Sequence, residues 1–234
     1  MGENKVIEVD SYLAKDFMDS TKSSGSFPPL HDAAYHGKED VVSLILLSGT
    51  SPDECMSDKQ TAAHVTSSAE VIKTLAKANA NLDIQDDKLR TPLHTVQMNH
   101  GNQDEQYGAL EELLNQGANP NITDKYKRTP LHIATENDDD DAVKILLDSK
   151  KTNINVKDNK GMTPLMTAVQ SNSIDTVISL LEANARVYMR NDNGDTALQI
   201  AKENNVDEDI IEVLQQYNAS RRQPNSKPGT KYPF

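Results

Sequence analysis

The sequence Thr91-Pro92-Leu93-His94 returns, residue for residue, as Thr129-Pro130-Leu131-His132. Threonine is a favourable N-cap and proline is favoured at the first helical position, so both copies predict the start of a helix. Degenerate copies extend the series in both directions. They are Pro28-Pro29-Leu30-His31, Thr61-Ala62-Ala63-His64, Thr163-Pro164-Leu165-Met166 and Thr196-Ala197-Leu198-Gln199, which makes six copies of one signature.

The six copies begin 33, 30, 38, 34 and 33 residues apart, and a regular period of this length is typical of repeat proteins. An apolar stripe behind each signature predicts a second helix, as at residues 143–147. Most stripes end near a residue that readily adopts a left-handed backbone, as a helix C-terminus requires; these residues are Gly49, Asn79, Gly117 and Asn184. Each copy therefore predicts a pair of helices that is stable only when stacked against its neighbours.

The signature and its period resemble those of the ankyrin-repeat family over residues 27–217. The resemblance implies an all-α fold, an ankyrin-repeat solenoid of stacked helix-turn-helix units with β-hairpin fingers. Its six repeats would begin near residues 28, 61, 91, 129, 163 and 196. Because a solenoid needs capped ends, we expect residues 1–26 to form an N-terminal leader with a capping helix at 10–20, and the sixth repeat to be the C-terminal cap. Residues 218–234 form a basic, proline-containing tail that we expect to be unstructured.

Three features depart from the repeat pattern. The second copy is about three residues short between its helices, which predicts a first helix of one turn. The third copy carries an insertion near residues 99–106, which we expect to protrude as a loop that is either functional or a tolerated surface insertion. Lys59, Leu89 and Lys127 stand at finger tips where the family often has glycine, so these turns are expected to depart from the usual shape.

Charge and composition limit the partners. The formal net charge is −12, which argues against nucleic acid as the main partner, because duplex binding depends on neutralising phosphates. Residues 218–234 contribute four of the positive charges and no acid, which leaves −16 on the rest of the chain. No run of 18 apolar residues and no signal-peptide pattern occurs, so we expect no membrane association and a cytoplasmic or nuclear location. The single Cys55 fits a reducing compartment.

Sequence motifs for catalysis or metal binding are absent. There is no nucleophile elbow, phosphate-binding loop or HExxH pair. His31, His64, His94 and His132 share one motif position, which favours a repeated structural role over a ligand set. The acidic run at residues 138–141 lacks the spacing and glycine of a calcium loop and is better explained by the start of a helix. We expect no cofactor, no metal, no small-molecule ligand and no enzymatic activity.

The resemblance also implies where partners bind, because ankyrin proteins usually contact them through finger tips and the exposed ends of the first helices. Carried over to this sequence, the predicted partner-binding residues are Asp87, Lys88, Arg90, Met98, Asn99, Lys125, Tyr126, Arg128, Glu136, Asn137, Asn159, Lys160, Met162, Gln170 and Ser171. The tips are predicted to form a basic stripe with Tyr126 and Met162 as anchors, which suggests an acidic or phosphorylated partner segment. The alternative is that the lysines are only solvated. In the tail, Arg221, Arg222, Tyr232 and Phe234 are predicted to dock onto a partner.

Two functions follow from the resemblance. The first is a protein–protein interaction module that acts as an adaptor or scaffold subunit of a larger assembly. The second is an inhibitor or regulator of a kinase or transcription factor, and a shortened second repeat is also found in ankyrin-class inhibitors of cyclin-dependent kinases. Ankyrin repeats specify a shape and leave recognition to scattered surface residues, so the partner does not follow from the sequence.

Overall fold

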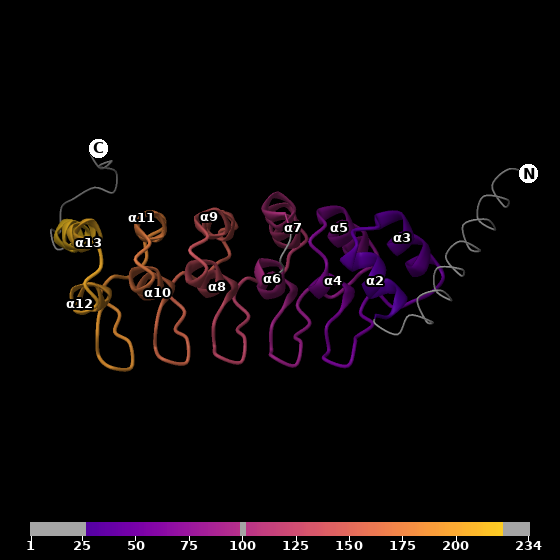
Figure 1. Cartoon of the computed structure of the whole chain (residues 1–234), viewed down its shortest axis with the longest axis horizontal. Helices are drawn as coiled ribbons and strands as arrows, with labels where there is room; N and C mark the ends of the chain where they lie inside the picture. Colours follow the sequence, from indigo (N-terminus) through magenta and orange to yellow (C-terminus); the bar gives the residue numbers. More distant parts are fainter. Residues whose placement is uncertain (1–26, 99–101, 222–234) are drawn as a thin grey trace, which may run out of the picture.

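The computed structural model describes residues 27–98 and 102–221 as a row of helix pairs (Figure 1). In chain order the elements are α2 (Pro29–Tyr35), α3 (Glu39–Leu47), α4 (Ala62–Val65), α5 (Ala69–Lys77), α6 (Pro92–Thr95), the 3₁₀ helix η1 (Val96–Met98), α7 (Gln103–Asn115), α8 (Pro130–Glu136), α9 (Asp140–Asp148), α10 (Pro164–Gln170), α11 (Ile174–Glu182), α12 (Ala197–Glu203) and α13 (Glu208–Arg221). The predicted all-α solenoid is confirmed. No strand occurs in these two ranges, so the fingers are paired loops that end in tight turns.

The repeats stack side by side in two layers of helices (Figure 1). The first helices, α2, α4, α6, α8, α10 and α12, form an inner layer next to the fingers, and the second helices form the outer layer. Neighbouring fingers are joined near their tips by single backbone hydrogen bonds. Examples are the bond from Lys125 N to Lys88 O (3.0 Å) and the bond from Asn159 N to Tyr126 O (2.9 Å). The fingers therefore form a continuous ledge along one edge of the solenoid.

A buried histidine joins most inner helices to the next finger. In the third repeat, Nδ1 of His94 accepts hydrogen bonds from the backbone N–H and the hydroxyl of Thr91 (3.2 and 3.0 Å), and Nε2 donates to Arg128 O (3.0 Å). His31, His64 and His132 make the same contact from Nε2 to Gln60 O, Arg90 O and Met162 O. Burial lowers the pKa of all four imidazoles, and that of His94 falls to about 4. The repeated structural role predicted for these residues is confirmed.

The outer helices end as the sequence predicts. Gly49, Asn79, Gly117 and Asn184 have φ values of 95°, 62°, 93° and 68°, in the left-handed region that terminates a helix. In the fourth repeat Lys150 takes this role with φ 55°. A helix can therefore end at a lysine with a left-handed backbone, and its end is then not predictable from the positions of glycine and asparagine.

The second and third repeats depart from the pattern in different ways. Helix α4 has four residues, so the predicted single-turn helix is confirmed. The expected loop at residues 99–106 is wrong for residues 103–106, which form the first turn of α7 and make that helix 13 residues long. The side chain of Asn102 accepts a hydrogen bond from Asp104 N, and Asp104 and Glu105 favour the positive end of the helix dipole. Residues 99–101 lie outside the described ranges.

The finger tips keep one shape despite their different residues. Lys59, Leu89 and Lys127 have φ values of 63°, 57° and 61°, close to the 72° of Gly161, so the expected departure from the usual turn is wrong. An aspartate carboxylate explains this for the tips at Leu89 and Lys127, because it accepts two backbone N–H groups across each turn. These hydrogen bonds outweigh the strain of a left-handed backbone conformation at a residue other than glycine.

The two ends of the solenoid differ from expectation in one respect. Helix α13 continues to Arg221, so residues 218–221 are helical where an unstructured tail was expected. Tyr217 is buried and its hydroxyl donates to Leu181 O at 2.7 Å, which ties the last helix to the fifth repeat. The predicted capping helix at residues 10–20 lies outside the described residues. None of the described helices is long and apolar enough to cross a lipid bilayer.

Candidate protein-binding surface

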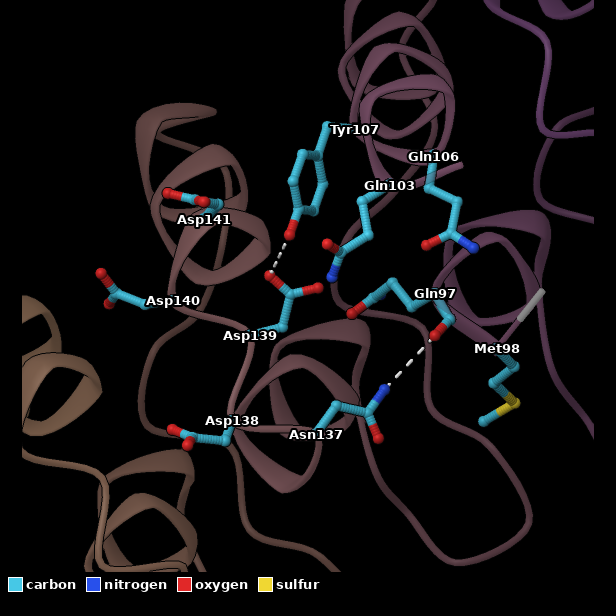
Figure 2. Close-up of a pocket in the computed structure, with 10 residues that line it drawn as sticks. All are labelled: Gln97, Met98, Gln103, Gln106, Tyr107, Asn137, Asp138, Asp139, Asp140 and Asp141. Atoms are coloured by element: carbon cyan, nitrogen blue, oxygen red, sulfur yellow. Dashed lines mark hydrogen bonds between the residues drawn. The ribbon is translucent and has the colours of Figure 1, made fainter. Parts of the chain in front are cut away.

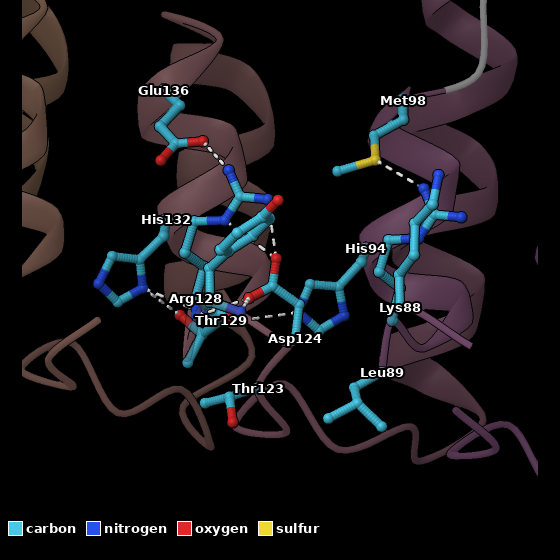
Figure 3. Close-up of polar contacts among 12 residues, drawn as sticks. Lys88, Leu89, His94, Met98, Thr123, Asp124, Arg128, Thr129, His132 and Glu136 are labelled. Carbon is cyan, nitrogen blue, oxygen red and sulfur yellow. Dashed lines mark hydrogen bonds and ion pairs between the residues drawn. The ribbon is translucent and has the colours of Figure 1, made fainter. Parts of the chain in front are cut away.

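The two central fingers, residues 83–90 and 121–128, share one internal design. The carboxylate of Asp124 is 3% exposed and accepts hydrogen bonds from Tyr126 N (2.8 Å), Arg128 N (2.9 Å) and Arg128 Nε (2.9 Å). Asp86 does the same for its own finger, where Arg90 Nε donates at 2.7 Å. A buried aspartate therefore holds each turn and the arginine that follows it, and Figure 3 shows this arrangement for Asp124 and Arg128.

Arg90 and Arg128 both form ion pairs with acidic residues within the fold. Burial alone would raise the pKa of Asp86, but the hydrogen bonds and charge of Arg90 lower it below its usual value. Burial alone would lower the pKa of Arg128, but Asp124 and Glu136 raise it, and Arg128 Nη1 lies 2.5 Å from Glu136 Oε2. Burial in turn raises the pKa of Glu136 against the effect of Arg128. Arg90, Arg128 and Glu136, all predicted to bind a partner, therefore neutralise charges inside this surface.

The lysines that precede these arginines on the two fingers are exposed. No ion pair with another residue in the described ranges is made by Lys88, Lys125 or Lys127. Leu89 and Tyr126 lie among them and are 48% and 44% exposed. Lys125 Nζ and Arg128 Cζ lie 4.8 and 5.0 Å from the centre of the Tyr126 ring, which restrains it. We call Lys88, Leu89, Lys125, Tyr126 and Lys127 the tip patch.

Positive charge is not spread evenly along the fingers. Residues 121–128 carry three basic side chains and one acid, whereas residues 83–90 carry two basic side chains and three acids. Asp87, one of the predicted contacts, pairs with Lys59 of the preceding finger at 3.0 Å. The expected basic stripe is therefore concentrated on the finger at residues 121–128, with Lys88 beside it.

The remaining predicted contacts fall into three groups. Asn159 and Lys160 are exposed on the finger after the tip patch, and Gln170 and Ser171 are exposed at the end of α10. Met98 and Asn137 lie at the ends of inner helices, where Asn137 Nδ2 donates to Gln97 O at 3.3 Å. Asn99, Arg222, Tyr232 and Phe234 lie outside the described residues, and Arg221 is the last residue of α13.

Met162 does not provide the surface anchor that the sequence suggested. It is 8% exposed and packs in the hydrophobic core. Its backbone is also engaged, because its N–H donates to Asp158 Oδ1 at 2.8 Å and its carbonyl accepts from His132 Nε2. The residue is apolar and flexible by type, but the stacking of neighbouring fingers covers it.

An acidic hollow of about 960 Å³, the rim pocket, opens where the inner and outer helices of the third and fourth repeats meet (Figure 2). Its lining residues are Gln97, Met98, Gln103, Gln106, Tyr107, Asn137, Asp138, Asp139, Asp140 and Asp141. The hydroxyl of Tyr107 donates to Asp139 Oδ1 at 2.9 Å, and burial together with this carboxylate raises the pKa of Tyr107 to about 12. Asp139 also caps α9 by accepting from Ala142 N, as predicted for an acidic run at a helix start. Gln103 and Gln106 were missed because residues 99–106 were expected to form a loop, and Tyr107 follows directly after them on the same helix.

Comparison with known proteins identifies the family. Residues 30–105 and 102–191 match the family model described as ankyrin repeats in three copies. The chain belongs to the ankyrin-repeat family. Ankyrin repeats are protein–protein interaction modules, so this chain is one as well.

Solved structures support the fold. The chain is similar to the ankyrin repeat domain of Bcl-3, described as a unique member of the IkappaB protein family, with 24% identity, a TM-score of 0.74, and coverage of 90% of this chain and 95% of that one. It is also similar to an ankyrin repeat domain from Acinetobacter baumannii AYE, with 26% identity, a TM-score of 0.70, and coverage of 81% and 97%. A search of curated proteins found no significant match.

Proposed function

We propose that this ankyrin-repeat chain is a non-catalytic adaptor or scaffold subunit, and that its tip patch recognises an acidic or phosphorylated segment of a partner protein. The observation that carries the proposal is the set of exposed lysines around Tyr126 on a rigid ledge. A location in the cytoplasm or nucleus accords with this function.

Charge favours an acidic partner for this surface. The whole chain is acidic at −12, yet residues 121–128 have a surplus of two positive charges. Complementary charges speed association and select partners, and their effect weakens as salt rises. An acidic segment would therefore be repelled by most of the molecule and attracted to this ledge.

The ledge is also suited to a stable contact. Tyrosine is enriched among residues that dominate binding energy, because it buries a large area with few rotatable bonds. Tyr126 is restrained by two cations, and its finger is held by Asp124 and by backbone hydrogen bonds to both neighbours. Little conformational freedom remains to be lost on binding.

The test is affinity capture with mass spectrometry, using the full chain and the variant Lys88→Glu, Lys125→Glu and Tyr126→Ala. The matched control is Lys73→Glu, Lys202→Glu and Tyr188→Ala, which makes the same changes at exposed positions away from the central fingers. We expect stoichiometric partners to be lost with the tip variant and kept with the control. Phosphatase treatment of the captured material separates a phosphorylated segment from one rich in Asp and Glu.

One result would overturn the tip-patch assignment. If the partners survive the tip variant but are lost when the chain ends at Arg221, the C-terminal tail carries recognition. A partner enzyme whose activity falls on adding the purified chain would identify an inhibitor in place of a scaffold.

A further inference from the structure

The one-turn helix α4 leaves a hollow of about 270 Å³ on the inner face between α2 and α6, which we call the notch. Its lining residues are Phe27, Tyr35, Gln60, His64, Val65, Arg90, Thr95 and Met98. Helices α2 and α8 have seven residues, whereas α4 has four and is followed by the extended residue Thr66 (φ −89°, ψ 146°). The three residues that α4 lacks relative to α2 and α8 amount to nearly one turn, and we attribute the open space to their absence.

One wall of the notch is aromatic. Tyr35 is 60% exposed and stacks on Phe27, with ring centres 6.0 Å apart and planes 15° from parallel. The His36 and Tyr35 rings are nearly perpendicular, with ring centres 5.3 Å apart. These contacts hold an exposed aromatic face in place before any partner arrives.

The opposite wall consists of Met98 and Arg90, and its polar groups are already engaged. Arg90 binds Asp86 through Nε and Nη2, and its Nη1 lies 3.5 Å from the sulfur of Met98. Below them, the hydroxyl of Thr95 donates to His64 O at 2.8 Å. The notch therefore offers aromatic, aliphatic and thioether surface with few unsatisfied polar groups.

We propose that the notch receives one aromatic side chain, tryptophan or phenylalanine, from the same acidic segment that the tip patch binds. This inference rests on the proposed function. Pockets for drug-sized ligands occupy about 300–1,000 Å³, so a hollow just below that range suits a single large side chain. Aromatic rings stack well on tyrosine, and methionine sulfur makes favourable contacts at ring edges.

The positive charge for acidic flanking residues comes from the lysines of the tip patch, because Arg90 in the notch is already paired with Asp86. Arg90 lines the notch and belongs to the same finger as Lys88. Lys88 O accepts the hydrogen bond from Lys125 N, which joins that finger to the positively charged residues 121–128. A segment that leaves the notch along the fingers therefore passes exposed lysines.

Methionine-methyl NMR of the full chain tests this proposal, because Met98 lines the notch whereas Met162 is buried elsewhere in the core. Met98 also lines the rim pocket, so variants at Tyr35 and Val65, which line only the notch, assign the shift. Three probes are titrated: acetyl-Glu-Glu-Trp-Glu-Glu-amide, its glycine-flanked counterpart acetyl-Gly-Gly-Trp-Gly-Gly-amide, and acetyl-Glu-Glu-Ala-Glu-Glu-amide. We expect both tryptophan peptides to shift the Met98 methyl signal and leave that of Met162 unchanged. The alanine peptide should leave Met98 unchanged, and the acidic tryptophan peptide should bind about tenfold more tightly than the glycine-flanked one.

Two variants and one control accompany the titration. Val65→Phe fills the notch from its half-buried floor, and Tyr35→Ala removes the stacking wall. Each should weaken binding of the tryptophan peptides about tenfold or more. Tyr188→Ala removes another exposed tyrosine, 67% exposed and distant from the notch in the repeat order, and should leave binding unchanged.

Several outcomes overturn the proposal. One is a Met98 signal that neither tryptophan peptide shifts at about 1 mM, a concentration that detects weak binding. Another is a shift produced equally by the alanine peptide. If the Met98 signal changes with protein concentration in the absence of peptide, a second copy of the chain occupies the notch. If it changes on Phe17→Ala in the absence of peptide, the chain's own residues 1–26 occupy the notch.

The same titration separates the notch from the proposed function. If the glycine-flanked tryptophan peptide binds but glutamates add nothing, the notch stands and the acidic preference of the tip patch fails. If glutamates bind at the tip patch and tryptophan leaves Met98 unchanged, the tip patch stands and the notch proposal fails.

Discussion

At the scale of single residues, the histidine of the repeat signature is the main link between neighbouring repeats. It accepts from the threonine that starts its own helix and donates to a carbonyl of the next finger, as His94 does. The structural role was predictable because the residue recurs at one motif position. The link to the next finger was not, because it depends on how two repeats are stacked. In the first repeat Pro28 replaces the threonine, and Nδ1 of His31 has no hydrogen-bond partner among the described residues.

The buried histidines should make stability depend on pH. The folded-state pKa of His94 is about 4 and the unfolded value is about 6.5, so the unfolded chain binds more protons between these limits. Stability is therefore full above pH 6.5 and falls as the pH is lowered towards 4, and His94 alone accounts for about 2–3 kcal/mol by pH 4.5.

The variant His94→Gln tests this dependence, because Gln199 already fills the same position in the sixth repeat and accepts from Thr196 N. At pH 7 the variant should lose about 1–2 kcal/mol, since its hydrogen bond to Arg128 O is lost. Its further loss between pH 7 and 4.5 should be smaller than that of the parent chain. Urea unfolding at several pH values measures both. The exposed His36→Gln is the control, and an equal pH slope in His94→Gln and the parent would contradict the assignment.

At the scale of elements, the turns and helix ends are decided by local hydrogen bonds more than by residue type. The sequence predicted where helices begin, because Thr-Pro carries the signal itself. It did not predict that residues 103–106 are helical. Their polar composition is typical of a loop, but Asn102 caps a helix that begins at Gln103. It also did not predict that Leu89 and Lys127 accept a left-handed backbone, because the aspartate that stabilises the turn lies at its other end.

Glycine substitutions at the tips should separate backbone strain from steric contact. Leu89 has φ 57° and an exposed side chain, so Leu89→Gly should leave stability unchanged or raise it by up to about 1 kcal/mol. Gly161 has φ 72°, and a Cβ there would lie 2.4 Å from Asp192 Oδ1 and 2.7 Å from Asp192 N. Gly161→Ala should therefore cost about 1–3 kcal/mol. Thermal unfolding of both variants measures the contrast, and equal effects at the two tips would refute this explanation.

At the scale of the whole molecule, the number and order of repeats were predictable, because their period is visible in the sequence. The distribution of charge over the surface was only partly predictable. Arg90 and Arg128 looked available for a partner but lie against buried aspartates, and Met162 lies under a neighbouring finger. Such facts depend on contacts between repeats. The rim pocket and the notch arise in the same way, from helices that are longer or shorter than their neighbours.

The C-terminal end should depend on α13 more than on the tail. Tyr217 is 8% exposed and bonded to Leu181 O, so Tyr217→Ala should cost about 3 kcal/mol and Tyr217→Phe about 1 kcal/mol. Gln216→Ala changes an exposed neighbour on the same helix and should have little effect. A chain that ends at Arg221 should unfold at the same urea concentration as the full chain. A marked loss of stability in that truncated form would show that the tail also caps the solenoid.

The series of histidine links stops before the end of the solenoid, because the fifth signature has Met166 and the sixth has Gln199 at the histidine position. Protonation in acid therefore weakens the histidine links at the junctions formed by the first four repeats, whereas the junction between the last two has no such link. The order in which the repeats unfold should consequently depend on pH as well as on the sequence. In mild acid we therefore expect the four junctions that carry a histidine link to weaken before the junction between the fifth and sixth repeats.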